Sequence, residues 1–196
     1  VGKATASSKA TVYSSMAGAM NALSGPLHGR ANQSCLEFVL KVGTSDPVEV
    51  EAAIESNTQY IVFNEPYNPA GTLMKADIQQ KLVAIARKYN ITILCDEAYR
   101  LLEHDEKDRL PAMADLYENG ISACTISKPW GGCGITIGWL ALQDLKLKQK
   151  LVDVQYFGTA CASRASEIQA IMTLRASDII LKKNLQIIQK NLQLLD

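Results

Sequence analysis

The chain has 196 residues, of which 47% are hydrophobic and 20% charged, and its 20 Lys and Arg balance 20 Asp and Glu. This composition excludes disordered and fibrous proteins and favours a globular fold with a sizeable core. A net charge of zero gives no indication of binding to nucleic acid or to a charged membrane surface. The apolar runs are too short to span a bilayer and the first residues lack a signal pattern, so we expect a cytoplasmic protein.

The cysteines give no pattern typical of a disulfide framework or a zinc site. None of the five has a partner at the spacing of a metal-binding pair. We therefore expect reduced thiols and no bound metal ion. The five are Cys35, Cys95, Cys124, Cys133 and Cys161.

Residues 1–47 differ in pattern from the rest of the chain and are expected to be helical. Apolar residues recur at helical spacing from Val12 to Leu23, with many small residues between them. Gly25-Pro26 would end this helix, and a second helix is expected over residues 32–42. We therefore expect two parts, an all-helical segment over residues 1–47 and an α/β domain over residues 48–196.

From residue 48 onward, apolar strands alternate with amphipathic helices. Such alternation predicts an α/β fold with a mostly parallel sheet and flanking helices. The last expected helix carries an apolar stripe from Leu181 to Leu195 that needs covering, either by self-association or by a further small domain. Strands are expected at 59–64, 91–95, 122–126 and 135–142, and helices at 75–89, 111–120, 144–157, 163–175 and 177–195.

Three polar motifs follow three of these strands. They are Asn68-Pro69-Ala70-Gly71, Asp96-Glu97-Ala98-Tyr99 and Ser127-Lys128. Taken singly, each has a simpler interpretation, namely a turn, a helix cap and a solvated lysine. Ligands of open parallel sheets bind beyond the carboxyl ends of the strands. The ordered conjunction of the three motifs therefore predicts a site where an amide, a carboxylate, a phenol and an amine converge.

These motifs in this order resemble the class I/II aminotransferases, which are fold-type I pyridoxal-phosphate enzymes, over about residues 48–196. The stretch Ser127–Gly134 is also similar to a subgroup near capreomycidine synthase. The resemblance implies a pyridoxal 5'-phosphate cofactor, an amino acid and a keto acid as substrates, and a homodimer. The chain departs from the family pattern at Thr136, where members often have an arginine.

The resemblance also implies a role for each site residue. Lys128 would form the Schiff base with the cofactor and move the substrate proton. Asp96 would face the ring nitrogen and keep it protonated. The remaining cofactor contacts would be Asn68 and Tyr99 at the phenolic oxygen, and Thr125 and Ser127 at the phosphate.

The string from Leu23 to Gln33, with the small-residue helix before it, resembles citrate synthase over about residues 4–48. This second resemblance implies that His28 polarises the thioester carbonyl of acetyl-CoA. The histidine, aspartate and arginines that would complete such a site do not follow in this chain. We therefore expect a chimera or fusion joined near residues 46–56.

Three functions remain open at this point. The favoured one is aminotransferase-type chemistry that depends on pyridoxal phosphate, and it predicts a chromophore linked to a lysine. A non-enzymatic chimeric scaffold predicts cooperative folding without cofactor binding. A citrate synthase-like acyltransferase fragment predicts acetyl-CoA binding that depends on His28.

Overall fold

The computed structural model describes residues 46–158 and 160–194. The chain divides into two compact units, residues 1–54 and 55–196. The expected helices before residue 45, together with His28, lie outside the described residues. In the first unit the description covers one short helix, α4 (Pro47–Ala52). Asp46 caps it by accepting a hydrogen bond from the Val48 N–H at 2.9 Å, and Pro47 occupies the first helical turn, which tolerates proline.

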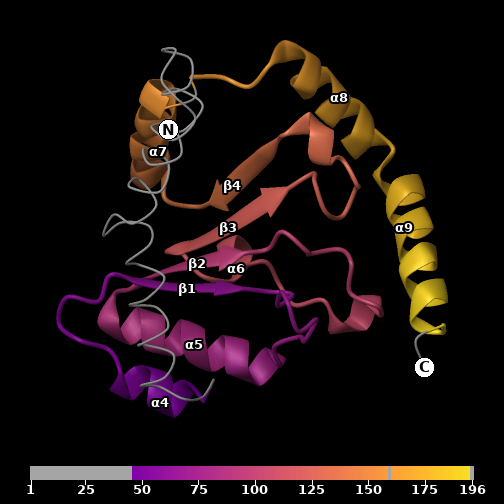
Figure 1. Ribbon diagram of the computed structural model, residues 1–196. Helices are drawn as coiled ribbons and strands as arrows, with labels where there is room; N and C mark the ends of the chain where they lie inside the picture. Colours follow the sequence, from indigo (N-terminus) through magenta and orange to yellow (C-terminus); the bar gives the residue numbers. More distant parts are fainter. Residues whose placement is uncertain (1–45, 159, 195–196) are drawn as a thin grey trace, which may run out of the picture. The chain divides into compact units, whose positions relative to one another are not determined.

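The second unit contains a four-stranded sheet in the order β1-β2-β3-β4 (Figure 1). The strands β1 and β2 are parallel, as are β2 and β3, whereas β3 and β4 are antiparallel. The prediction of a mostly parallel sheet is therefore confirmed. The strands are β1 (Tyr60–Asn64), β2 (Thr92–Asp96), β3 (Gly120–Thr125) and β4 (Gly138–Leu142).

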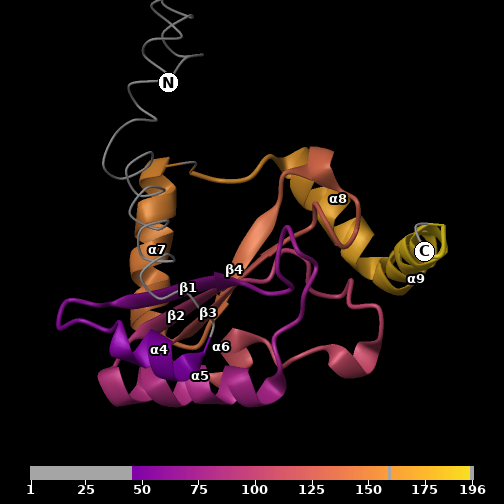
Figure 2. The ribbon, with the colours of Figure 1, turned by 60° about the horizontal axis from the view of Figure 1, so that its bottom comes forward.

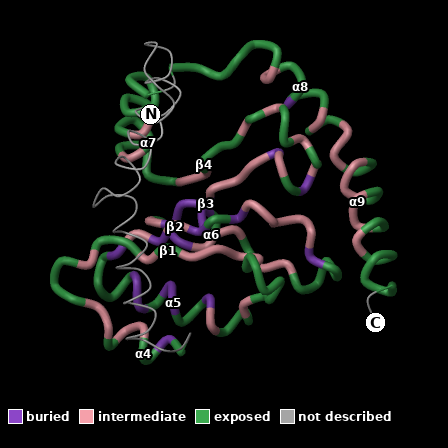
Figure 3. Tube along the Cα trace, in the orientation of Figure 1, coloured by how far each residue is buried: buried purple, intermediate pink, exposed green. Residues whose placement is uncertain are grey.

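Two helices in the crossovers, α5 (Ala76–Tyr89) and α6 (Met113–Leu116), cover one face of the sheet (Figure 2). Successive right-handed crossovers in one direction place both helices on the same side. The core lies between them and the strands, where Figure 3 shows most of the buried chain. The largest fully buried side chains are Tyr117, Ile91, Ile93, Met113, Ile126, Val83 and Ser122.

The helix expected over residues 111–120 is wrong in length, because α6 ends at Leu116. Tyr117 leaves the helix with extended backbone, and its buried phenol donates a 2.8 Å hydrogen bond to the Ile91 carbonyl oxygen. Gly120 then begins β3 instead of ending a helix. At Gly120 a Cβ atom would collide with the Met113 carbonyl oxygen, so this close approach requires glycine.

The last three helices agree with the prediction to within a few residues. They are α7 (Leu145–Gly158), α8 (Arg164–Arg175) and α9 (Ser177–Leu192). The strand β4 starts later than expected, because residues 133–135 form the short 3-10 helix η2 (Cys133–Ile135). The apolar stripe of α9 is half-buried at Leu181 and exposed at Leu192. In the part of the chain that the structure describes, no helix combines the length and the apolar character needed to cross a membrane.

Candidate active site

Three parallel strands end side by side, and the predicted motifs follow these ends. The register places Asn64 of β1 beside Asp96 of β2, and Asp96 beside Ala123 of β3. In Figure 1 the arrowheads of β1, β2 and β3 point to the side where α9 runs. The loops that carry Asn68, Tyr99 and Lys128 therefore leave the sheet at one edge, as the sequence predicts.

Asn64 joins the first two of these loops. Its side-chain amide donates to the Asp96 carbonyl oxygen at 2.8 Å, and its side-chain oxygen accepts from the Asn68 N–H at 2.6 Å. Sequence reasoning did not single out this residue. The available signal was an amide side chain that closes an apolar strand directly before the Glu65-Pro66 turn.

Asp96 presents a carboxylate at the end of β2. Its Oδ1 accepts a 3.0 Å hydrogen bond from the Ala98 N–H, which fixes the side chain over its own turn. Its Oδ2 has no hydrogen-bond partner among the described residues, and the residue is exposed. Asp96 can therefore accept one further hydrogen bond from a cationic N–H donor.

Asn68 and Tyr99 line one cleft, although they come from loops after different strands. Tyr99 is half-buried and Asn68 is exposed. His104 and Ile188 also line this cleft. Sequence reasoning missed both residues as parts of a site, because no motif connects α9 or the loop after Tyr99 to the strand ends. Neither Asp96 nor Lys128 lines the cleft.

The lysine motif lies on a tight turn after β3. The Thr125 hydroxyl donates to the Ser127 hydroxyl at 3.1 Å and accepts from the Ser127 N–H at 3.2 Å. The Lys128 carbonyl oxygen accepts from the Gly131 N–H at 3.2 Å. The Lys128 side chain is exposed, and within residues 46–158 and 160–194 its ammonium has no hydrogen bond or ion pair, including to Asp96.

A buried carboxylate supports the loop that carries Asp96 and Tyr99. Glu97 is only 4% exposed, and its Oε1 accepts from the Ser122 hydroxyl at 2.6 Å and from the Met113 N–H at 2.8 Å. Its Oε2 lies 3.8 Å from Arg100 Nε. These contacts connect the loop to β3, to α6 and to Arg100, so we infer that Glu97 keeps Asp96 in place.

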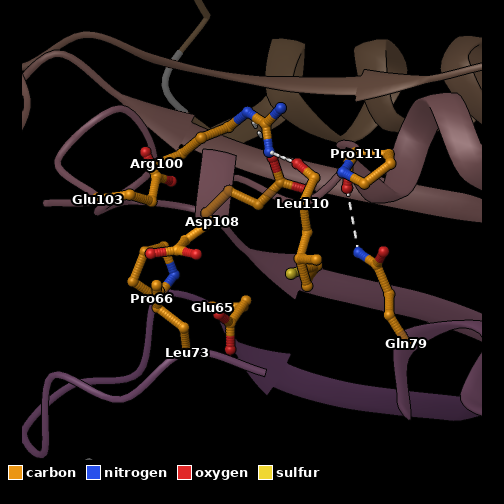
Figure 4. A pocket seen from close by; sticks show the side chains of 11 residues that line it. Glu65, Pro66, Leu73, Gln79, Arg100, Glu103, Asp108, Leu110 and Pro111 are labelled. Carbon is orange, nitrogen blue, oxygen red and sulfur yellow. Dashed lines mark hydrogen bonds and ion pairs between the residues drawn. The ribbon is translucent and has the colours of Figure 1, made fainter. Parts of the chain in front are cut away.

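Further acidic side chains line a small cavity behind this loop (Figure 4). Arg100 Nη1 donates to the Leu110 carbonyl oxygen at 2.7 Å, and the buried Glu103 pairs with Arg109 at 3.0 Å. Burial raises the pKa of the Glu65 carboxyl, the Met74 N–H opposes this shift, and the Glu103 carboxylate adds to it. Polar contacts of buried and half-buried side chains therefore stabilise the loop after β2 from behind.

The polar groups at this edge suit an organic ligand that carries several hydrogen-bond donors and acceptors. They are a carboxylate with one oxygen unbonded among the described residues, an amine, an amide, a phenol and two hydroxyls. In the described part of the chain, no group of three or more His, Cys, Asp or Glu residues is placed to hold a metal ion. The arrangement can therefore bind a ligand through hydrogen bonds and through a reactive amine.

Comparison with known proteins agrees with this arrangement. The sequence profile described as "Aminotransferase class I and II" matches residues 11–196. The probable aspartate aminotransferase of Methanocaldococcus jannaschii is 30% identical over 137 residues, which are 67% of this chain and 36% of that protein. The aspartate aminotransferase of Pyrococcus horikoshii is 32% identical over 104 residues, which are 53% of this chain and 27% of that protein.

A solved structure shows the same fold. The crystal structure of a PLP-dependent aminotransferase from Streptococcus suis superposes with a TM-score of 0.72 and 30% sequence identity. The match covers 77% of this chain and 39% of that one. The chain thus spans well under half the length of these relatives. Because the family profile matches nearly all of its residues, the chain belongs to the aminotransferase class I and II family.

Proposed function

We propose that this chain forms the cofactor-binding part of a pyridoxal-phosphate-dependent aminotransferase. The observation that carries the proposal is the convergence of three motifs at the carboxyl ends of β1, β2 and β3. The named relatives are aminotransferases, and the family profile supports the same activity. Because the chain covers only part of their length, the activity of the whole protein belongs to this proposal.

The residues at the edge fit the polar groups of pyridoxal phosphate. The free oxygen of Asp96 suits the protonated ring nitrogen, and the amide of Asn68 and the phenol of Tyr99 suit the phenolic oxygen. The Lys128 amine suits the aldehyde. When bound, the cofactor supplies an electron sink that weakens the Cα–H bond of an amino acid. Thr125 and Ser127 offer hydroxyls for the phosphate.

Each protein group has a distinct task in this arrangement. Asp96 keeps a negative charge at the ring nitrogen, because Ala98 and Asn64 hold the end of β2 in place. A charge-assisted hydrogen bond there is stronger than a neutral one. Lys128 would hold the cofactor through its amine and would then be the group that moves the substrate proton, since this amine has no competing partner among the described residues.

The test is a titration of the protein with pyridoxal phosphate, followed by absorbance. Asp96→Asn should weaken binding about 10- to 100-fold, the range for losing a hydrogen bond to a charged group. Asp153→Asn on α7 is the matched control, because Asp153 is exposed and far along the chain from the motifs. Equal affinities for the two variants would contradict the role of Asp96.

Several finer features belong to the same proposal. They are an amino acid and a keto acid as substrates, a homodimer, a cytoplasmic location and a relation to capreomycidine synthase at Ser127–Gly134. The names of two relatives support the substrate class, since one is an aspartate aminotransferase and the other a probable one. Sedimentation of the purified protein tests the dimer, and screening of amino donors tests the substrate class.

The likeness of residues 4–48 to citrate synthase stays a prediction, as does the role of His28. The aminotransferase profile overlaps most of this segment, so the comparisons favour neither the acyltransferase nor the scaffold alternative. His28→Ala is expected to leave binding of pyridoxal phosphate unchanged. Acetyl-CoA binding that His28→Ala abolishes would instead support the acyltransferase alternative.

A further inference from the structure

The helix α9 runs across the edge of the sheet where the motifs lie (Figures 1 and 2). Three side-chain hydrogen bonds connect this helix to the site loops. Trp130 Nε1 donates to Ser177 Oγ at 2.7 Å, and Asn184 Nδ2 donates to the Pro129 carbonyl oxygen at 2.8 Å. Farther along the helix, Gln189 Nε2 donates to the His104 carbonyl oxygen at 3.3 Å.

Two of these three bonds fix the residues that directly follow Lys128. Pro129 is buried, and Trp130, Ser177 and Asn184 are half-buried, so water competes little for these polar groups. The Pro129 carbonyl needs this partner, since a buried carbonyl without one carries a free-energy cost.

The turn after Lys128 is packed on both sides. A Cβ atom at Gly132 would lie 2.6 Å from the Ile126 Cγ2 atom, so a larger residue would force a shift on that side. A Cβ atom at Gly131 would lie 3.9 Å from Asn184 Nδ2, which shows that the amide of α9 packs against the other side. The turn therefore rests between β3 and α9.

The Lys128 side chain has no partner of its own in the described part of the chain. The backbone of the turn fixes the Lys128 Cα atom from which this side chain extends. The turn supplies two internal hydrogen bonds, from Gly131 to Lys128 and from Gly132 to Ile126. Cys133 Sγ also donates to the Ser127 carbonyl oxygen at 3.3 Å. Asn184 and Ser177 of α9 bond to the two residues that follow Lys128.

We propose that Asn184 is a positioning residue, with Ser177 as a second support, and that α9 determines where the Lys128 amine stands at the sheet edge. This inference rests on the proposed role of Lys128. Asn184 acts through Pro129 and needs no contact with cofactor or substrate. The same helix also places Ile188 in the cleft with Asn68 and Tyr99. It therefore contacts both the loop that carries Lys128 and the cleft that contains the Tyr99 phenol.

The test compares Asn184→Leu with Asn191→Leu. Both substitutions replace an amide by an uncharged side chain of similar size on the same helix, and Asn191 is exposed. The first readout is hydrogen exchange of the Gly131 and Gly132 amides in protein without cofactor. Exchange in Asn184→Leu should be about fivefold faster than in wild type, as expected for the loss of one hydrogen bond.

The second readout separates positioning from general stability. It is the pH midpoint of the absorbance of bound pyridoxal phosphate, which should move in Asn184→Leu and stay at the wild-type value in Asn191→Leu. Ser177→Ala should change the hydrogen exchange and the pH midpoint in the same direction as Asn184→Leu. It replaces Asn184→Leu in this test if that variant does not fold. The inference would be overturned if Asn184→Leu had the same exchange rates and pH midpoint as Asn191→Leu. It would also be overturned if exchange became faster in Asn184→Leu while its pH midpoint stayed at the wild-type value.

A further measurement keeps this inference separate from the proposed function. If the wild-type protein takes up no pyridoxal phosphate, the proposed function fails. Acylation of Lys128 by a small active ester then decides the inference, because it needs no cofactor. A different rate at Lys128 in Asn184→Leu than in Asn191→Leu supports the positioning role, and equal rates overturn it.

Discussion

The side-chain amide of Asn64 donates a 2.8 Å hydrogen bond to the Asp96 carbonyl oxygen, while its oxygen accepts from the Asn68 N–H at 2.6 Å. One side chain therefore connects the ends of β1 and β2 with the loop that carries the amide of the site. This connection explains how the exposed Asn68 loop and the exposed Asp96 carboxylate can stay at a fixed distance from each other. It also makes Asn64 the first residue to test.

Asn64→Ala should lower the free energy of unfolding by about 1–2 kcal/mol, because it removes two hydrogen bonds. It should also weaken binding of pyridoxal phosphate, since the Asn68 loop loses its anchor. Urea unfolding and a cofactor titration measure the two effects. Asn57→Ala is the control, because Asn57 is exposed and precedes β1. A cofactor affinity equal to that of the control would show that Asn64 does not organise the site.

Glu97→Ala should destabilise the protein by about 2–4 kcal/mol, because it leaves the Ser122 hydroxyl and the Met113 N–H without their acceptor. Glu97→Gln keeps an acceptor oxygen and should cost less. Glu106→Ala is the control, since this carboxylate is 86% exposed where it pairs with Arg109. Urea unfolding measures all three variants. Equal losses for Glu97→Ala and Glu106→Ala would contradict the supporting role of Glu97.

Tyr117→Phe should lower the free energy of unfolding by about 1 kcal/mol or more, because the Ile91 carbonyl loses its donor in a buried setting. Tyr117 is only 1% exposed, so water has little access to replace its phenol as the donor. Tyr60→Phe is the matched control, because Tyr60 is 56% exposed. Thermal unfolding compares the two, and an unchanged transition in Tyr117→Phe would show that this bond does not contribute to stability.

Stability should fall as pH rises from 9 toward 11. Burial raises the pKa of the Cys124 thiol from 9.0 to about 11, and the Glu97 charge adds to the shift. Over this range the unfolded chain has lost the thiol proton while the folded chain keeps it, so the unfolding free energy decreases with pH. Below the unfolded pKa this contribution is constant. Burial also raises the pKa of Cys95, which adds to the same decline.

Cys124→Ala should reduce the slope of unfolding free energy against pH in that range, as measured by urea unfolding at several pH values. Cys133→Ala is the control, because that cysteine is exposed. A slope in Cys124→Ala equal to that in Cys133→Ala would contradict the assignment.

The strands and long helices could be predicted from sequence because their apolar periodicity is local. The predicted bounds of β1, β2 and β3 agree with the structure to within two residues, and those of α5 to within one. The prediction failed at α6, where Tyr117 leaves the helix to reach Ile91. That contact is non-local, so the spacing of apolar residues does not reveal it.

The same distinction applies to the site. Asp96, Tyr99, Asn68 and Lys128 could be singled out because each belongs to a short motif after a strand. Their supports could not be found in this way, because these depend on contacts between distant segments. Examples are the bond from Asn184 to Pro129 and the bond from Ser122 to Glu97. The roles given to the motif residues remain predictions for the experiments above.

The most direct test of the account is to trap the cofactor. The purified protein is mixed with pyridoxal phosphate and reduced with borohydride, and the modified peptide is mapped by mass spectrometry. The account predicts one main adduct on Lys128, which Lys128→Ala removes and Lys148→Ala on the exposed face of α7 does not. Adducts spread over several exposed lysines, or an undiminished yield in Lys128→Ala, would contradict it.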